Sequence, residues 1–101
     1  MPVSEAESQR RVLIAGCGYV GTALARHLVT QGWRAFGLRR TPGALPPGID
    51  PVIADLSRPE SLVALPEALD AVVYAAAADD RSPEAYHRAY VAGLEHLLAA
   101  L

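Results

Sequence analysis

The feature that most constrains this sequence is a glycine-rich turn between an apolar run and an amphipathic segment. Residues 16–21 read Gly-Cys-Gly-Tyr-Val-Gly and follow the apolar run at residues 11–15. An apolar run without alternation is typical of a strand that is buried on both faces. Beyond the turn, apolar residues recur at the spacing of one helix face until Gly32: Val20, Ala23, Leu24, Leu28 and Val29. A strand, a tight turn and a helix are therefore predicted in succession.

Strand-like and helix-like segments alternate along the rest of the chain. Further strands are predicted at residues 33–38, 51–55 and 71–76. A short helix is predicted from Ser57 to near Pro66, and a last helix from Ser82 to the chain end. Residues 39–48 are rich in proline and glycine, which predicts a loop. This loop barely supplies the dozen or so residues that a parallel crossover needs.

This alternation favours an α/β fold, a doubly wound parallel sheet of the Rossmann type. We expect residues 1–10 to form a flexible lead-in and residues 11–101 to form one dinucleotide-binding domain. No glycine, asparagine or proline ends the last helix after Leu94. We therefore expect the chain to hold the first four strands of a larger, truncated domain.

Composition narrows the classes of function. The formal net charge is -2 and no basic run is present, which argues against a nucleic-acid partner. The apolar runs are too short to span a membrane, and the N-terminus lacks the pattern of a signal peptide. The single cysteine excludes an internal disulfide and a cysteine-cluster metal site, which fits a cytoplasmic protein. The histidines show no ligand spacing, so no metal site is predicted.

Each glycine of the turn has a predicted role in binding the pyrophosphate of a dinucleotide. Gly16 permits the tight turn, Gly18 lets the backbone approach the phosphates, and Gly21 lets the helix pack on the strand. The helix aims its N-terminal N–H groups at the anion. The predicted contacts are Gly16, Cys17, Gly18, Tyr19, Val20 and Gly21. The alternative is a turn used only for packing, and a flavin dinucleotide ranks below a nicotinamide cofactor.

The end of the second predicted strand favours NADP, with NAD as the less favoured cofactor. NAD-binding chains carry an acidic residue about 20 residues past the glycines, which binds the ribose 2′-hydroxyl. Arg39 and Arg40 stand there instead. Because an arginine fork matches a phosphate and its plane stacks on adenine, both are candidates for the 2′-phosphate and adenine contacts. The alternative is a pair of solvated loop arginines.

The ends of the other two predicted strands supply further candidates. Asp55 can accept a hydrogen bond from the adenine amino group, with Leu56 against the ring. Ala75 and Ala76 are small and keep the floor open beside the ribose and the nicotinamide. The alternatives are a turn aspartate that caps backbone N–H groups and a general bias toward alanine.

The segment Val12–Gly21, with Arg39-Arg40, Asp55-Leu56 and Ala75-Ala76, resembles the extended or atypical short-chain dehydrogenase/reductase superfamily, also called the NAD-dependent epimerase/dehydratase family. Residues 90–98 also resemble that family's helix after the fourth strand. The resemblance implies a longer protein with a catalytic Tyr-x-x-x-Lys after the fifth strand. This chain contains no lysine, so no catalytic residue is assigned.

Together these features predict the NADP(H)-binding part of a short-chain-type oxidoreductase or sugar-nucleotide-epimerase-like protein. Its chemistry would be hydride transfer at a carbinol or carbonyl carbon of an unidentified small molecule. The alternative is a non-catalytic NAD(P)-binding sensor or regulatory protein. The sequence is compatible with a homodimer.

Overall fold

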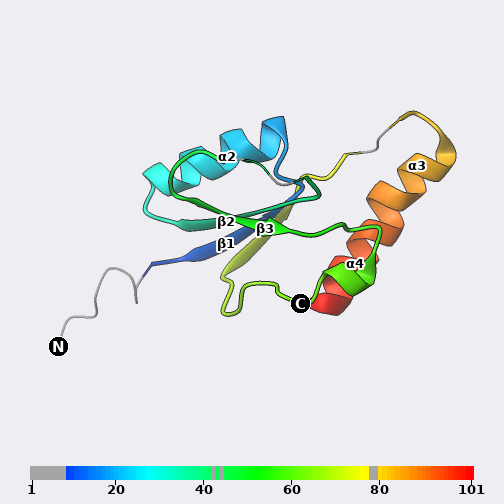
Figure 1. Cartoon of the computed structure of the whole chain (residues 1–101). Coiled ribbons are helices and arrows are strands. Elements are labelled where there is room, and N and C mark those ends of the chain that lie inside the picture. The colour runs from blue at the N-terminus through cyan, green and yellow to red at the C-terminus, as the bar shows by residue number, and fades with distance from the viewer. Residues whose placement is uncertain (1–8, 42, 44, 78–79) are drawn as a thin grey trace.

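The computed structural model describes residues 9–41, 43, 45–77 and 80–101, so most of the expected lead-in lies outside the described residues. The strands β1 (Arg11–Ala15), β2 (Arg34–Arg39), β3 (Ile49–Ile53) and β4 (Ala71–Tyr74) form one parallel sheet in the order β3-β2-β1-β4. The predicted α/β fold with a parallel sheet is confirmed (Figure 1). No helix in the described part of the chain is long and apolar enough to cross a bilayer.

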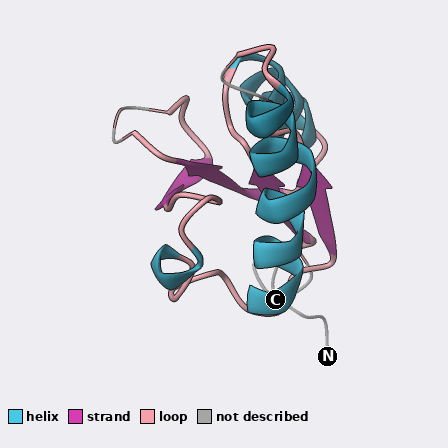
Figure 2. Cartoon of the chain, turned by 90° about the vertical axis from the view of Figure 1, so that its right-hand side faces the viewer, coloured by secondary structure: helices cyan, strands magenta, loops and turns pink. Residues whose placement is uncertain are grey.

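Helices cover both faces of the sheet. Helix α2 (Tyr19–Thr30) joins β1 to β2, and the final helical segment comprises α3 (Pro83–His87), the π-helical turn η2 (Arg88–Ala92) and α4 (Gly93–Ala100). Figure 2 views the molecule from the side on which α3 and α4 lie.

The central strand β1 is buried on both faces, as its unbroken apolar run predicts. Successive side chains of a strand point to opposite faces. Val12 and Ile14 therefore pack in a cluster with Ala25 of α2, whereas Leu13 packs in a second cluster with Leu97 of α4. The carboxyl end of β1 is thus held between two apolar layers.

A loop replaces the helix of a usual crossover between β2 and β3. The two strands pair in parallel although only residues 40–48 join them. Leu45 of this loop packs in the same apolar cluster as Leu28 and Val29 of α2. Gly48 has a φ of +90°, and a Cβ there would lie 2.9 Å from Val29 Cγ1. Residues 40–48 therefore suffice for a parallel crossover, and Leu45 and Gly48 pack closely against α2.

The second strand is shifted by one residue from its predicted position and the fourth ends two residues early, whereas the third strand and the short helix differ in ways that need an explanation. The third strand begins two residues earlier than predicted and places Pro51 at its centre. A proline without an N–H group is tolerated there because β3 is an edge strand. The predicted helix from Ser57 to near Pro66 is wrong, since only a 3-10 turn, η1 (Pro59–Ser61), forms. The chain then turns inward, and the next residue, Leu62, is buried in the core.

A tyrosine from β4 explains the π-helical turn in the last helical segment. The Tyr74 hydroxyl donates a hydrogen bond to the Ala89 carbonyl, and the Gly93 N–H bonds instead to the Arg88 carbonyl, five residues back. A Cβ on Gly93 would lie 2.6 Å from the Tyr74 hydroxyl oxygen. Glycine therefore gives the tyrosine access to the helix backbone, and such insertions distort the hydrogen-bond ladder of a helix.

Candidate functional site

All four strands end at one cavity of about 500 Å³. In open α/β sheets, ligands bind outside the carboxyl ends of the strands, where this cavity lies. Every residue predicted to contact a cofactor lines it: Gly16, Cys17, Gly18, Tyr19, Val20, Gly21, Arg39, Arg40, Asp55, Leu56, Ala75 and Ala76. The fold thus brings together candidates that come from four separate segments.

Two glycines of the turn are required by the packing of the protein itself. Gly16 has a φ of +94°, and a Cβ there would lie 2.4 Å from the backbone nitrogen of Ala76. A Cβ on Gly21 would lie 2.6 Å from the Gly16 carbonyl oxygen and 3.0 Å from Ile14 Cγ2. These two positions explain the tight turn and the close contact of α2 with β1.

The protein's own packing does not explain Gly18. Its φ of −90° lies outside the left-handed region that favours glycine, and a Cβ there would meet no atom beyond its chain neighbours within 4 Å. Gly18 nevertheless lines the cavity. The missing side chain leaves open space over the turn, and this space fits a group that approaches the backbone closely.

The N-terminus of α2 offers hydrogen-bond donors at the same place. The first intrahelical bond runs from the Thr22 N–H to the Gly18 carbonyl at 2.9 Å, so the N–H groups of Tyr19, Val20 and Gly21 precede it. No side chain caps this end, and its first turn holds no acidic residue. Tyr19 and Val20 line the cavity and are 93% and 71% exposed. Such an end favours an anion.

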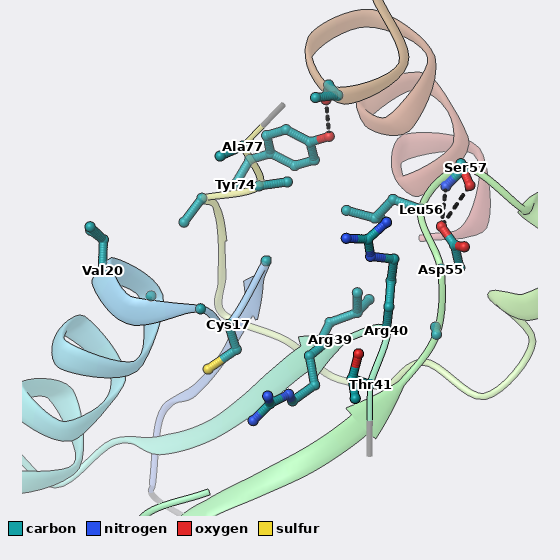
Figure 3. A pocket seen from close by; sticks show the side chains of 18 of the residues that line it. Cys17, Val20, Arg39, Arg40, Thr41, Asp55, Leu56, Ser57, Tyr74 and Ala77 are labelled. Atoms are coloured by element: carbon teal, nitrogen blue, oxygen red, sulfur yellow. Dashed lines mark hydrogen bonds between the residues drawn. The ribbon is translucent and has the colours of Figure 1, made fainter. Parts of the chain in front are cut away.

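The Cys17 thiol is turned away from the cavity. The residue is buried, and a Cβ on Gly37 of β2 would lie 2.7 Å from Cys17 Sγ. Figure 3 shows the sulfur pointing toward the ribbon of β2. Cys17 therefore borders the cavity with its backbone, and its side chain anchors the turn to the sheet.

Arginine dominates the charge of the cavity lining. Arg39 ends β2 and Arg40 follows it, Arg88 comes from η2, and Asp55 follows β3. The side chains of Arg39 and Arg40 point in different directions, with Arg40 directed toward Leu56 (Figure 3). Consecutive residues alternate in direction at the end of a strand, so the two guanidinium groups reach different parts of the cavity.

Asp55 is fixed by its own turn. Its Oδ1 accepts hydrogen bonds from the Ser57 N–H at 2.9 Å and the Ser57 hydroxyl at 2.7 Å. Burial alone would raise the pKa of the Asp55 carboxyl, but these bonds and the charges of Arg40 and Arg58 outweigh it and lower the pKa below 3.8. The group is therefore an ionised acceptor at neutral pH.

The sequence prediction missed several residues that line the cavity. Tyr74 ends β4, and Ala85, Arg88 and Ala89 present one face of the last helical segment to the cavity. The spacing of these three, at i, i+3 and i+4, is a helix-face signal that was available in the sequence. Tyr74 gave no such signal, because its partner lies 15 residues away. Among the residues that the structure describes, no three His, Cys, Asp or Glu side chains gather as metal ligands.

The comparisons with known proteins agree with this geometry. Residues 12–101 match the sequence profile of the NAD dependent epimerase/dehydratase family. No match was found among curated proteins.

Solved structures also match the chain. A protein of Methylobacillus flagellatus assigned as an NAD-dependent epimerase/dehydratase is 36% identical, with a TM-score of 0.64; the match covers 91% of this chain and 32% of that one. A protein of Burkholderia cenocepacia assigned as an epimerase is 28% identical over 93% of this chain and 33% of its own, with a TM-score of 0.72.

A third match is a short-chain dehydrogenase/reductase superfamily protein of Agrobacterium tumefaciens, which was solved with bound NAD. It is 26% identical, with a TM-score of 0.72, and the match covers 90% of this chain and 28% of that one. The chain therefore spans about a third of the length of the structures that it matches.

Proposed function

Because the chain belongs to the NAD-dependent epimerase/dehydratase family, we propose that residues 11–101 form the NADP(H)-binding part of a short-chain-type oxidoreductase or sugar-nucleotide-epimerase-like protein. Gly18 is the observation that carries this proposal. It lines the cavity, and no neighbouring side chain or backbone in the described protein would meet a Cβ there. A pyrophosphate that must approach the backbone supplies the reason.

Under this proposal, different lining residues contact different parts of the cofactor. Gly18 and the N–H groups at the start of α2 bind the pyrophosphate. Arg39 pairs with the ribose 2′-phosphate, because a guanidinium fork matches phosphate oxygens. This arginine is the reason to propose NADP, although a relative was solved with NAD.

The adenine end lies between β2 and β3. Arg40 extends toward Leu56 (Figure 3), so the base can pack between the guanidinium plane and the leucine side chain. Ser57 donates two hydrogen bonds to Oδ1 of Asp55, and under this proposal Oδ2 accepts a hydrogen bond from the adenine amino group. Ala75 and Ala76 leave room for the ribose on the nicotinamide side.

When bound, the cofactor supplies hydride exchange with a carbinol or carbonyl carbon. This chain's residues bind and orient the dinucleotide. They do not include a Tyr-x-x-x-Lys centre, because the chain has no lysine. Groups that move the substrate proton belong to the rest of the protein under this proposal.

Titration with NADPH and NADH, followed by nicotinamide fluorescence, tests the cofactor assignment. We expect NADPH to bind at least about tenfold more tightly, equivalent to roughly 1.4 kcal/mol. Equal affinities, or tighter binding of NADH, would contradict the role of Arg39.

Gly18→Ala tests the pyrophosphate site separately from folding. A Cβ at this position meets no protein atom within 4 Å, so the melting temperature should change little. It would occupy the space over the turn, so the affinity for both dinucleotides should fall about tenfold or more. Unchanged affinity would show that the phosphates bind elsewhere.

A further inference from the structure

A histidine outside the cavity holds one of the cavity's walls. His96 lies on α4, and its Nδ1 is 2.6 Å from the Leu56 carbonyl oxygen, 40 residues away in the sequence. A carbonyl only accepts, so Nδ1–H must be the donor, which fixes the tautomer of the ring. Leu56 lines the cavity, and His96 itself lies behind it, half-buried.

Apart from the bond from His96, the wall formed by Asp55, Leu56 and Ser57 has only local hydrogen bonds in the described part of the structure. The other hydrogen bonds recorded for these three described residues join positions at most six apart, within the turn itself. Local bonds shape the turn but do not fix its position relative to the last helix. The hydrogen bond from His96 connects the turn to α4.

The same helical segment is held close to the wall at a second point. A Cβ on Gly93 would lie 3.5 Å from Leu56 Cβ. Gly93 stands one turn before His96 and is buried. Small size at this position brings the helix near enough for the imidazole to reach the Leu56 backbone.

We propose that His96 is a positioning residue for the base-binding wall. By holding the Leu56 carbonyl, it sets the position of the leucine side chain against the base and of the Asp55 carboxylate against the base's amino group. It thereby sets the preference for an adenine dinucleotide over a hypoxanthine dinucleotide, in which an oxygen replaces that amino group. This inference rests on the proposed function.

Three variants separate the donor from the size and charge of the side chain. His96→Asn keeps an N–H donor near the position of Nδ1. His96→Asp matches asparagine in size but, when ionised, only accepts. His96→Leu removes the donor without adding charge. The readout is the ratio of affinities for NADPH and the reduced nicotinamide hypoxanthine dinucleotide phosphate.

In the wild type we expect a ratio of about ten, because a hydrogen bond to a charged acceptor contributes that order of preference. The ratio should persist in His96→Asn and approach about one in His96→Leu and His96→Asp. A wild-type ratio in His96→Leu or His96→Asp would overturn the inference, as would a ratio near one in His96→Asn.

Amide hydrogen exchange without ligand tests the bond itself, independently of any cofactor. We expect the amides of Ser57 and Arg58 to exchange at wild-type rates in His96→Asn and faster in the other two variants. Equal exchange in all four proteins would overturn the role of His96. If the wild type binds neither dinucleotide while exchange follows the donor, the proposed function fails and the positioning of the wall stands.

Discussion

At the scale of single residues, the glycines of the turn serve two different needs. A Cβ on Gly16 or Gly21 would clash with the protein's own backbone, whereas a Cβ on Gly18 would extend into open space. A sequence pattern lists all three alike. The distances from each missing Cβ separate the two glycines that the fold needs from Gly18, for which we propose a ligand as the reason.

Gly16→Ala should destabilise the protein, in contrast to Gly18→Ala. The residue has a φ of +94°, and the added Cβ would lie 2.4 Å from backbone atoms that cannot rotate away. We expect a loss of about 2 kcal/mol or more in the free energy of unfolding. Chemical denaturation of both variants side by side measures the difference, and equal stability would contradict this account of the turn.

The two arginines at the end of β2 should differ in their effects on cofactor choice. Arg39→Ala should weaken NADPH binding about tenfold and leave NADH binding nearly unchanged, because only NADPH carries the 2′-phosphate. Arg40→Ala should weaken both ligands equally, because its proposed partner is the shared adenine ring. Calorimetric titration with both nucleotides distinguishes these patterns. Arg39→Lys, which keeps the charge, is the control.

The Asp55 carboxyl gives a prediction about pH. Its pKa is lowered in the folded protein, so its contribution to stability is fully present above 3.8 and is lost as the pH falls through the lower folded value. Ser57→Ala removes the hydroxyl bond and should raise this pKa. A carboxyl NMR titration measures it, and an unchanged pKa would mean that the hydroxyl bond contributes little.

At the scale of elements, the last helical segment depends on β4 for its local geometry. The Tyr74 hydroxyl donates a hydrogen bond to the Ala89 carbonyl, and the helical turn that contains Ala89 is π-helical. Burial raises the pKa of this hydroxyl, so it remains a neutral donor at physiological pH. Strand and helix are therefore coupled at the edge of the cavity by a side chain that both elements share.

Tyr74→Phe should cost about 1 kcal/mol of stability and restore an α-helical turn at residues 88–92. The matched control is Tyr86→Phe, in which the side chain is 44% exposed and stacks on Tyr90. Backbone chemical shifts from Ala89 to Gly93 report the turn. Shifts that stay the same in Tyr74→Phe would mean that the π turn has another cause.

Elements whose signals are local were predicted well, and those set by distant partners were not. The order of strands and helices, the glycine turn and the start of the last helix at Ser82 follow from short-range patterns, and the Ser82 hydroxyl caps that helix by accepting the Ala85 N–H at 3.1 Å. The π turn depends on Tyr74, and the failure of the helix after Ser57 depends on Leu62 entering the core. Neither dependence is visible within one segment of sequence.

At the scale of the whole molecule, the sheet is stabilised by two apolar layers of different origin. One layer comes from α2 and the loop at residues 40–48, and the other from α4 and the segment after β3. The cavity lies at the end where both layers meet the strand ends. Its shape therefore depends on how α4 packs against the sheet, because Leu38 and Ala54 belong both to the core cluster of Leu97 and to the cavity lining.

Leu97→Ala should destabilise the whole domain by about 2–5 kcal/mol, because Leu97 is 1% exposed and belongs to the α4-side core. Leu98→Ala is the matched control one residue along, where the side chain is 63% exposed, and its effect should stay within about 0.5 kcal/mol. Thermal unfolding compares the two. Similar losses would indicate that α4 is not anchored through Leu97.

The π-helical turn also sets the rotational phase between the two halves of the last helical segment. Ala85, Ala89, Gly93 and Leu97 stand four residues apart, and in a continuous α-helix this spacing drifts by about 40° at every step. All four nevertheless face inward, half-buried or buried. In the π-helical turn each N–H bonds to the carbonyl five residues back, so the rotation per residue is smaller than in an α-helix. This smaller rotation cancels much of the angular drift. One hydroxyl group thus lets a single helical segment line the cavity with one half and the core with the other.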